Sequence, residues 1–248
     1  MITIKTPEEI QIIAEGGKIL AAALKELEKM AKPGVTTLEL DKAAEAFILS
    51  AGAKPGFKGY DGFPYSLCAS VNENIVHGYP SKYVLKEGDI VGLDLGVVYK
   101  GYNSDMAITV AVGNVSFEAK RLINVTKKAL RLGIKKVRPG NTVGDIGNTI
   151  QRFVEGQGFG VVRELCGHGI GKDLHEEPKI PNFGKRGGGE KLVEGMVICI
   201  EPMVTAGDFN LRKSDDGYGF ATKDNSLSAH FEHTIAVTKF GSKILTEL

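Results

Sequence analysis

The chain contains an internal repeat in which acidic residues occupy matching places in apolar segments. The segment that follows Gly88 reaches Asp94, and the segment that follows Gly195 reaches Glu201, so each carboxylate lies six residues past its glycine. Both acids stand in runs with the composition of buried β-strands, and the second run spans residues 197–204. Because an unpaired buried carboxylate loses solvation worth several kcal/mol, such positions need a compensating partner.

A second acid follows in each copy, at the head of another apolar run. Asp105 begins Asp-Met-Ala-Ile-Thr-Val, and Glu232 begins Glu-His-Thr-Ile-Ala-Val. A fold that relates the two copies by a pseudo-two-fold axis brings all four carboxylates together, where they repel one another. The economical explanation is a cluster of divalent cations at that axis.

The repeat continues upstream at a nearly constant offset. Pro33-Gly34 is matched by Pro139-Gly140, and Thr36 is matched by Thr142. Each copy has the pattern of two helices followed by antiparallel strands. The sequence therefore predicts an α+β fold with internal pseudo-symmetry.

The two copies occupy roughly residues 1–112 and 113–248. Neither half contains the full set of acids, so we predict a single domain over residues 1–248. The longer separation between Glu201 and Glu232 indicates an insertion in the second half.

Composition limits the classes of partner. The net charge of +1 offers no electrostatic case for nucleic acid or an anionic membrane surface, and no apolar stretch approaches the roughly 20 residues that span a bilayer. The three cysteines are odd in number and unclustered, which argues against a disulfide framework and suits a reducing cytoplasm. No exposed periodic pattern indicates a dimer, so we expect a monomer.

The histidines add a second kind of metal donor. His168 lies between two glycines, which allow the backbone to approach a cavity closely, and beside four carboxylates we expect its imidazole to bind metal. His175 is equally compatible with a position behind the metal ligands and with a contact to substrate, and His77 by itself is uninformative. His230 and His233 flank the last acid, and we expect both to be outward-facing or structural.

Taken together, these residues form an ordered series: His77, Asp94, Asp105, His168, His175, Glu201 and Glu232. The sequences around them include Gly101-Tyr102-Asn103-Ser104-Asp105, Gly167-His168-Gly169-Ile170-Gly171 and Ile200-Glu201-Pro202. Over essentially the whole chain, the series resembles the methionine aminopeptidases of the pita-bread metallopeptidase superfamily. The resemblance is to type I, which lacks an N-terminal zinc-binding extension and a long helical insertion. It implies a pseudo-two-fold, curved antiparallel sheet covered by helices.

The resemblance also implies two divalent metal ions. One ion would be held by Asp94, Asp105 and Glu232, and the other by Asp105, His168, Glu201 and Glu232. Two acids thus bridge the pair. Oxygen-rich ligation with one imidazole suits manganese, iron, cobalt or zinc, and the sequence does not choose among them.

The implied activity is removal of the N-terminal initiator methionine from nascent proteins, with a preference for a small second residue. Glu201 would act as the acid and base, His175 would contact the carbonyl or oxyanion, and His77 would contact the peptide nitrogen or backbone of the second residue. The methionine side chain would lie among Tyr60, Phe63, Cys68 and Tyr218. Leu174 and Phe57 depart from residues common in the family and are expected to alter pocket shape.

Two other hypotheses remain. One is an X-Pro dipeptidase or aminopeptidase P, which usually carries a large N-terminal domain. The other is a binding module of the same fold that has lost its metals, although all five ligand positions here carry coordinating side chains. Docking to the ribosome suits the implied role, but no basic cluster demonstrates it.

Overall fold

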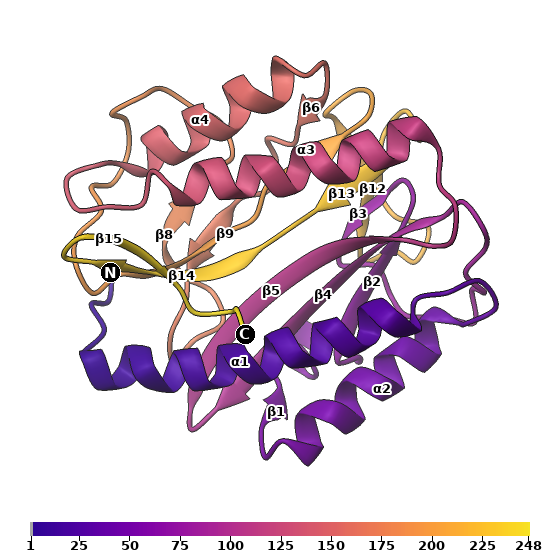
Figure 1. Cartoon of the computed structure of the whole chain (residues 1–248), viewed down its shortest axis with the longest axis horizontal. Helices are drawn as coiled ribbons and strands as arrows, with labels where there is room; N and C mark the ends of the chain where they lie inside the picture. The colour runs from indigo at the N-terminus through magenta and orange to yellow at the C-terminus, as the bar shows by residue number, and fades with distance from the viewer. Residues whose placement is uncertain (1) are drawn as a thin grey trace.

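The computed structural model describes residues 2–248, and both copies of the repeat begin with two helices. In the first copy these are α1 (Pro7–Met30) and α2 (Thr37–Ser50); in the second they are α3 (Phe117–Ile134) and α4 (Val143–Glu155). Figure 1 shows the helices on one side of the strands. The strands of the first copy are β1 (Lys54–Pro55), β2 (Leu67–Val71), β3 (Asn74–Val76), β4 (Ile90–Tyr99) and β5 (Tyr102–Ala111), with a short 3₁₀ turn at Tyr60–Gly62.

The strands of the second copy are shorter and more numerous. They are β6 (Gly160–Val161), β7 (Gly167–Gly169), β8 (Glu176–Ile180), β9 (Val197–Ile200), β10 (Met203–Thr205), β11 (Leu211–Lys213), β12 (Phe220–Thr222), β13 (Ser228–His230), β14 (His233–Thr238) and β15 (Gly241–Ile244). The hairpin β11–β12 pairs with β3 and lies within the expected insertion between Glu201 and Glu232.

The sequence repeat corresponds to a repeat of local structure. Thr36 and Thr142 are the N-caps of α2 and α4, and each forms a capping box with the residue three positions later. The matched glycines Gly88 and Gly195 both adopt left-handed backbone, with φ of 94° and 86°. Equivalent residues therefore perform equivalent structural tasks in the two halves.

Two antiparallel sheets meet at the centre of the molecule. One has the order β1-β4-β2 with β5 paired to β4, and the other has the order β15-β14-β9-β7-β8. The backbone N–H of Glu232 donates to the carbonyl of Ala107 at 2.9 Å, and the N–H of Asp105 donates to Thr234 Oγ1 at 2.9 Å. These bonds join the sheets where the second pair of acids lies.

The structure corrects one feature of the expected strands. The run 197–204 is not continuous, because β9 ends at Ile200 and β10 begins at Met203. Pro202 has no N–H to donate to a neighbouring strand, so the ladder breaks beside Glu201. Glu232 also lies in a break, between β13 and β14, whereas Asp94 and Asp105 lie inside unbroken strands.

The apolar core fills the space between helices and sheets. One cluster joins α1 and α2 to β2, β4 and β5, and another joins α3 and α4 to the second sheet. Two smaller apolar clusters lie outside this core, and one of them contains Phe57, Phe63, Cys68 and Leu174. Among residues 2–248, no helix combines the length and apolar character required to cross a bilayer.

Candidate metal centre and substrate pocket

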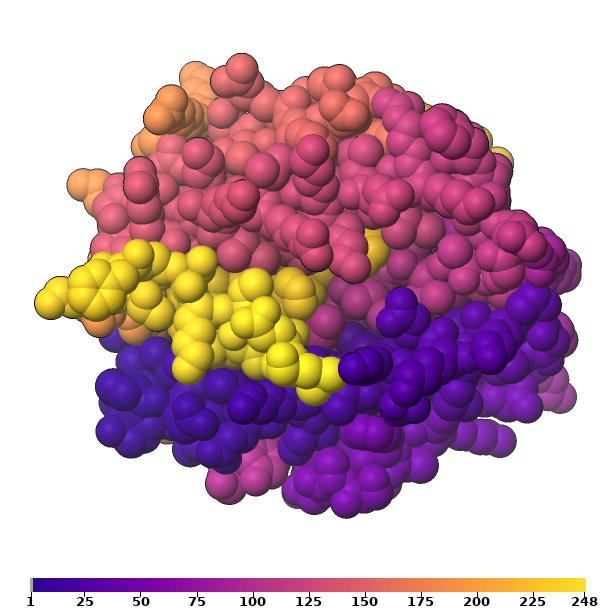
Figure 2. Space-filling model, in the orientation of Figure 1, coloured from indigo at the N-terminus to yellow at the C-terminus, as the bar shows by residue number. Residues whose placement is uncertain are grey.

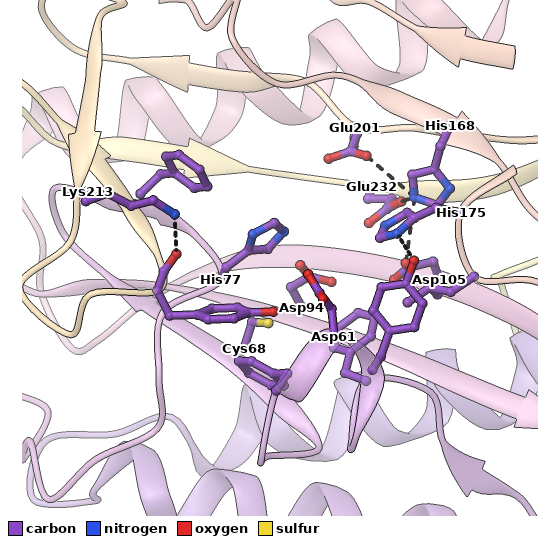
Figure 3. A pocket seen from close by; sticks show the side chains of 16 residues that line it. Asp61, Cys68, His77, Asp94, Asp105, His168, His175, Glu201, Lys213 and Glu232 are labelled. Atoms are coloured by element: carbon purple, nitrogen blue, oxygen red, sulfur yellow. Dashed lines mark hydrogen bonds and ion pairs between the residues drawn. The ribbon is translucent and has the colours of Figure 1, made fainter. Parts of the chain in front are cut away.

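The five expected metal donors come from five different segments and line one cavity of about 570 Å³. Asp94 lies on β4, Asp105 on β5 and His168 on β7, while Glu201 follows β9 and Glu232 precedes β14. Figure 3 shows their side chains converging from the two sheets. None of the residues that line the cavity belongs to α1, α2, α3 or α4.

His168 stands at the centre of the cluster. Its Nε2 lies 3.9 Å from Asp105 Oδ2, 3.7 Å from Glu201 Oε1 and 3.9 Å from Glu232 Oε1. Its Nδ1 lies 2.8 Å from the carbonyl oxygen of Gly169, which can only accept a hydrogen bond. This contact favours the tautomer with the proton on Nδ1, so Nε2 presents a lone pair to the carboxylates.

Three of the carboxylates form a tight buried group. Oxygen atoms of Asp94, Asp105 and Glu232 lie within 4.8 Å of one another. Asp94 Oδ1, Asp105 Oδ1 and Glu232 Oε1 are buried without a hydrogen-bond partner among the described residues. Burial, followed by the charge of neighbouring acids, raises the pKa of Asp105 and Glu232 well above the ordinary range, and burial raises the pKa of Asp94 to about 7.

This donor set fits divalent cations. Uncompensated buried carboxylate oxygens are costly, and cations at this position satisfy them and remove the mutual repulsion. Asp105 and Glu232 each face both the Asp94 side and the His168 side of the cluster, as bridging ligands must. The residues present therefore fit the metals that the sequence predicts.

Glu201 differs electrostatically from the other acids. Burial alone raises its pKa, but the nearby imidazoles of His230, His168 and His77 lower the pKa overall, with His230 Nε2 3.4 Å from Glu201 Oε2. Glu201 therefore stays ionised more readily than its neighbours, which suits a group that accepts a proton.

The expectation for His230 was wrong. Its side chain is buried, and its Nε2 lies 3.4 Å from Glu201 Oε2. His230 ends β13, two residues before Glu232, and side chains two apart in an extended run share a face. The even spacing of His230 and Glu232 in the sequence therefore already indicated that the two side chains lie on one side. His233, one residue after Glu232, faces away and contacts Thr246 Oγ1 through Nδ1 at 2.9 Å, in the structural role expected.

His175 and His77 lie at the edge of the donor cluster. The ring centroid of His175 is 4.4 Å from that of His168, and its Nδ1 lies 2.8 Å from the hydroxyl of Tyr60. Burial and the neighbouring His168 lower the pKa of His175 to about 4, so the ring is neutral near pH 7. His77 has a left-handed φ of 59°, an uncommon conformation for a residue with a side chain, and it faces the same cavity.

An aromatic wall forms the apolar end of the cavity. The rings of Phe63 and Tyr218 have centroids 5.4 Å apart, and Cys68 and Phe57 are buried beside them. Burial raises the pKa of Cys68 well above the ordinary value, so it presents a neutral thiol. Tyr60 and Leu174 also line the cavity. All of the expected pocket residues are therefore brought together.

Sequence reasoning missed other residues of the cavity. Asp61, Lys213 and Phe220 line it, and the last two come from the β11–β12 insertion. Thr234 Oγ1 holds the backbone of Asp105 in place. It accepts a hydrogen bond from the N–H of Asp105 and donates one to the carbonyl oxygen of the same residue. No local pattern marks these residues, because their roles depend on contacts between distant segments.

Comparison with known proteins agrees with this geometry. Residues 11–239 match metallopeptidase family M24, and the chain belongs to that family. Methionine aminopeptidases of Clostridium perfringens and Bacillus subtilis are 49% and 48% identical to it, over 99% and 100% of both chains. The structure of methionine aminopeptidase from Thermotoga maritima is 45% identical, with a TM-score of 0.98 over 100% of both chains. Within family M24, the chain groups with the methionine aminopeptidases.

The wider fold is shared with other members of the superfamily. The prolidase of Pyrococcus furiosus is 26% identical with a TM-score of 0.78, and the match covers 65% of that protein. The expected α+β pita-bread fold is therefore confirmed.

Proposed function

We propose that this chain removes N-terminal methionine from nascent polypeptides by metal-assisted hydrolysis. The observation that carries the proposal is the convergence of five metal donors, four of them buried, beside an apolar, aromatic cavity. Family M24 consists of metallopeptidases, and the end-to-end relatives are methionine aminopeptidases.

The metal ligands are Asp94, Asp105, His168, Glu201 and Glu232. Asp105 and Glu232 would be shared between two divalent ions of manganese, iron, cobalt or zinc, with Asp94 completing one site and His168 and Glu201 the other. When bound, such ions polarise the peptide carbonyl and lower the pKa of a water molecule.

The remaining chemistry belongs to side chains of the chain itself. Glu201 accepts the proton of the attacking water and returns it to the leaving amine, since its lowered pKa keeps it ionised. His175, a neutral imidazole, contacts the carbonyl or tetrahedral oxyanion, and Tyr60 orients its ring. His77 contacts the peptide nitrogen or backbone of the second residue.

The methionine side chain occupies the aromatic end of the cavity. Phe63, Tyr218 and Cys68 form a surface that suits an unbranched thioether, because sulfur packs favourably against aromatic rings. Phe57 and Leu174 line the same region and set its shape. We expect a preference for a small second residue, through a tight site near His77 and Tyr60, which both line the cavity.

The domain organisation and cellular location that we propose are consistent with this substrate. The site draws ligands from both halves, which supports one catalytic domain over residues 1–248. All three cysteines are free, as suits the reducing cytoplasm where nascent chains are made. We expect a monomer that meets its substrate at the ribosome.

Peptide hydrolysis tests the proposal. The protein is stripped with chelator and reconstituted with manganese, iron, cobalt or zinc in turn, and methionine release is measured from Met-Ala-Ser and Met-Leu-Ser. Metal-restored cleavage of Met-Ala-Ser alone is the expected result and ranks the metals. Failure to release methionine with any metal overturns the proposal.

The same assay separates the alternative hypotheses. Cleavage of a Leu-Pro dipeptide would assign the chain to the prolidase branch, whose structures share the fold at lower identity. Inactivity on every peptide, together with no metal retained, would favour the binding module.

A further inference from the structure

One free thiol lies beside the proposed metal ligands. Cys199 is the third residue of β9, two residues before Glu201, and its side chain is fully buried. Its neighbours Ile198 and Ile200 pack into the apolar cluster that contains α3 and α4. Because side chains alternate along an extended run, Cys199 and Glu201 face the opposite side, toward the metal centre.

The pairing of β9 sets this thiol next to a proposed ligand. Gly169 of β7 pairs with Ile198 of β9. In an antiparallel ladder this register places the preceding residue, His168, opposite Cys199. On the other side of β9, Cys199 pairs with Thr234 of β14, and its Sγ lies 3.6 Å from Thr234 Oγ1. The sheet therefore holds the thiol between two strands that carry or border metal donors.

Three unlike donors converge at this point. One ligand atom each of His168, Cys199 and Glu232 lies within 4.8 Å of the other two. Glu232 is 2% exposed, and its Oε1 has no hydrogen-bond partner among residues 2–248. We call these three residues the sulfur site. It shares two donors with the proposed two-ion set, which is completed by Asp94, Asp105 and Glu201.

The thiol is closed off from the outer surface. Cys199 belongs to an apolar cluster with Ile13 of α1 and with Leu245 near the C-terminus. Figure 2 shows the C-terminal segment, in yellow, lying against α1, in indigo. His168 and Glu232 line the catalytic cavity, whereas Cys199 is not among the lining residues. An ion therefore reaches the thiol through the cavity, past the other two donors.

Sulfur changes which ions such a site prefers. Manganese favours oxygen donors, whereas a thiolate favours softer ions, of which cadmium is a divalent example. Zinc accepts both kinds of donor, so cadmium is the discriminating probe. Binding replaces the proton of the thiol with the ion, and that proton passes to solvent.

We propose that His168, Cys199 and Glu232 bind one thiophilic divalent ion, such as cadmium, as an alternative to the oxygen-rich two-ion set. Because His168 and Glu232 belong to both sets, occupation of the sulfur site takes two donors from the two-ion set. A thiophilic ion should therefore inhibit the peptidase. This last consequence rests on the proposed function, whereas the binding itself does not.

Ultraviolet absorption tests the proposal, because a cadmium–thiolate bond has a charge-transfer band that oxygen and nitrogen ligands lack. The whole chain is stripped with chelator and titrated with cadmium alone. Cys199→Ser and Cys199→Ala each remove the thiol, and the matched controls Cys68→Ser and Cys166→Ser remove the other free thiols. Circular dichroism and thermal unfolding show whether each variant is folded.

We expect the wild-type band to saturate at one cadmium per chain. Both Cys199 variants should lose the band and bind cadmium at least about 10-fold more weakly, and both control variants should retain it. Asp94→Asn, which alters the two-ion set alone, should also retain the band. His168→Ala should weaken cadmium binding by about 10-fold or more.

Several results would overturn the proposal. These are a wild-type chain without the band, and a band that persists in either Cys199 variant. Loss of the band in Cys68→Ser or Cys166→Ser would assign the sulfur to another cysteine. Loss of the band in Asp94→Asn would place the ion in the two-ion set instead.

Peptide cleavage separates this proposal from the proposed function. Cadmium should suppress methionine release from Met-Ala-Ser by the manganese-loaded protein, and Cys199→Ser should need at least about 10-fold more cadmium for the same fractional loss. Equal cadmium sensitivity would contradict the competition that the shared donors impose. A cadmium–thiolate band in a chain that cleaves no peptide would refute the proposed function alone, whereas cleavage without the band would refute the sulfur site alone.

Discussion

At the residue scale, Asp105 is an acid whose burial costs stability, so its presence has to be explained by function. It is a buried carboxylate with an unpartnered oxygen and two acidic neighbours, and Thr234 fixes its backbone from the facing sheet. No packing reason favours an acid here. The position is explained only by the cation that it is proposed to bind.

Asp105→Asn separates these two contributions. We expect turnover and metal retention to be lost together, because the neutral amide cannot replace a bridging carboxylate. In chelator near pH 7, the same variant should be more stable than wild type, since folding no longer requires a buried carboxyl to take up a proton. Metal analysis and thermal unfolding measure both effects. Full metal retention in Asp105→Asn would remove this residue from the ligand set.

His175 and its neighbour His168, which we propose binds metal, should respond differently to mutation. His175→Ala should retain metal yet lose activity by about 10²-fold or more, because the neutral imidazole at the carbonyl is removed. His168→Ala, the matched comparison, should lose metal as well. Loss of metal in both variants would mean that His175 is itself a ligand.

His230 supports Glu201 from the side away from His168. His230→Leu removes the donor at 3.4 Å, and we expect kcat to fall about 10- to 100-fold with little change in KM. His230→Gln, which retains a donor, should recover most of the activity. Equal activity in the Leu and Gln variants would show that His230 only fills space.

At the scale of elements, the two copies of the repeat have kept the same local devices. Thr36 and Thr142 cap α2 and α4, and a bridge in each copy ties the cap to the segment before the long strand, with Thr36 opposite Val84 and Thr142 opposite Lys191. The strands have diverged more, because the second copy accommodates the β11–β12 insertion.

Removing either cap should have a similar effect. Thr36→Ala and Thr142→Ala should each lower the free energy of unfolding by about 1 kcal/mol, or about 2–4 °C in melting temperature. Ser at either position retains the capping oxygen and should be nearly neutral. Peptide cleavage should be unchanged, since neither threonine lines the cavity. A tenfold fall in cleavage would instead couple the helix starts to the site.

At the scale of the whole molecule, the metal centre couples stability to pH. Burial raises the pKa of Asp94 to about 7 from an ordinary value near 3.8. In the metal-free protein this carboxyl therefore favours the folded state at low pH, and that contribution is lost as pH rises through about 7. Cations reverse the trend because they bind the ionised form.

Metal addition should thus raise the melting temperature more at pH 7.5 than at pH 5.5. Calorimetry with chelator, and then with excess manganese, measures the difference at each pH. In Asp94→Asn the pH dependence of the metal-free protein should flatten between pH 4 and 7. A metal-induced shift that is larger at pH 5.5 than at pH 7.5 would contradict the raised pKa.

Much of the fold and of the candidate site could be predicted from local features of the sequence. The duplicated acids, the matched threonines and glycines, and His168 between its glycines are local signals. They were sufficient to predict the α+β fold and to select the five proposed donors, which the structure places in one cavity. Such signals can be recognised in the sequence because each reflects short-range interactions. This holds for a left-handed glycine, for a helix cap and for an acid in an apolar run.

Only the tertiary structure decided what depends on segments meeting in space. Three such features arise where strands from different segments of the chain converge. His230 contacts Glu201, Thr234 hydrogen-bonds the backbone of Asp105, and Lys213 and Phe220 line the cavity. The exposed cations of α3 likewise share one side of the helix only because its apolar side is buried. Composition averages charge over the chain, whereas the fold decides where each charge lies.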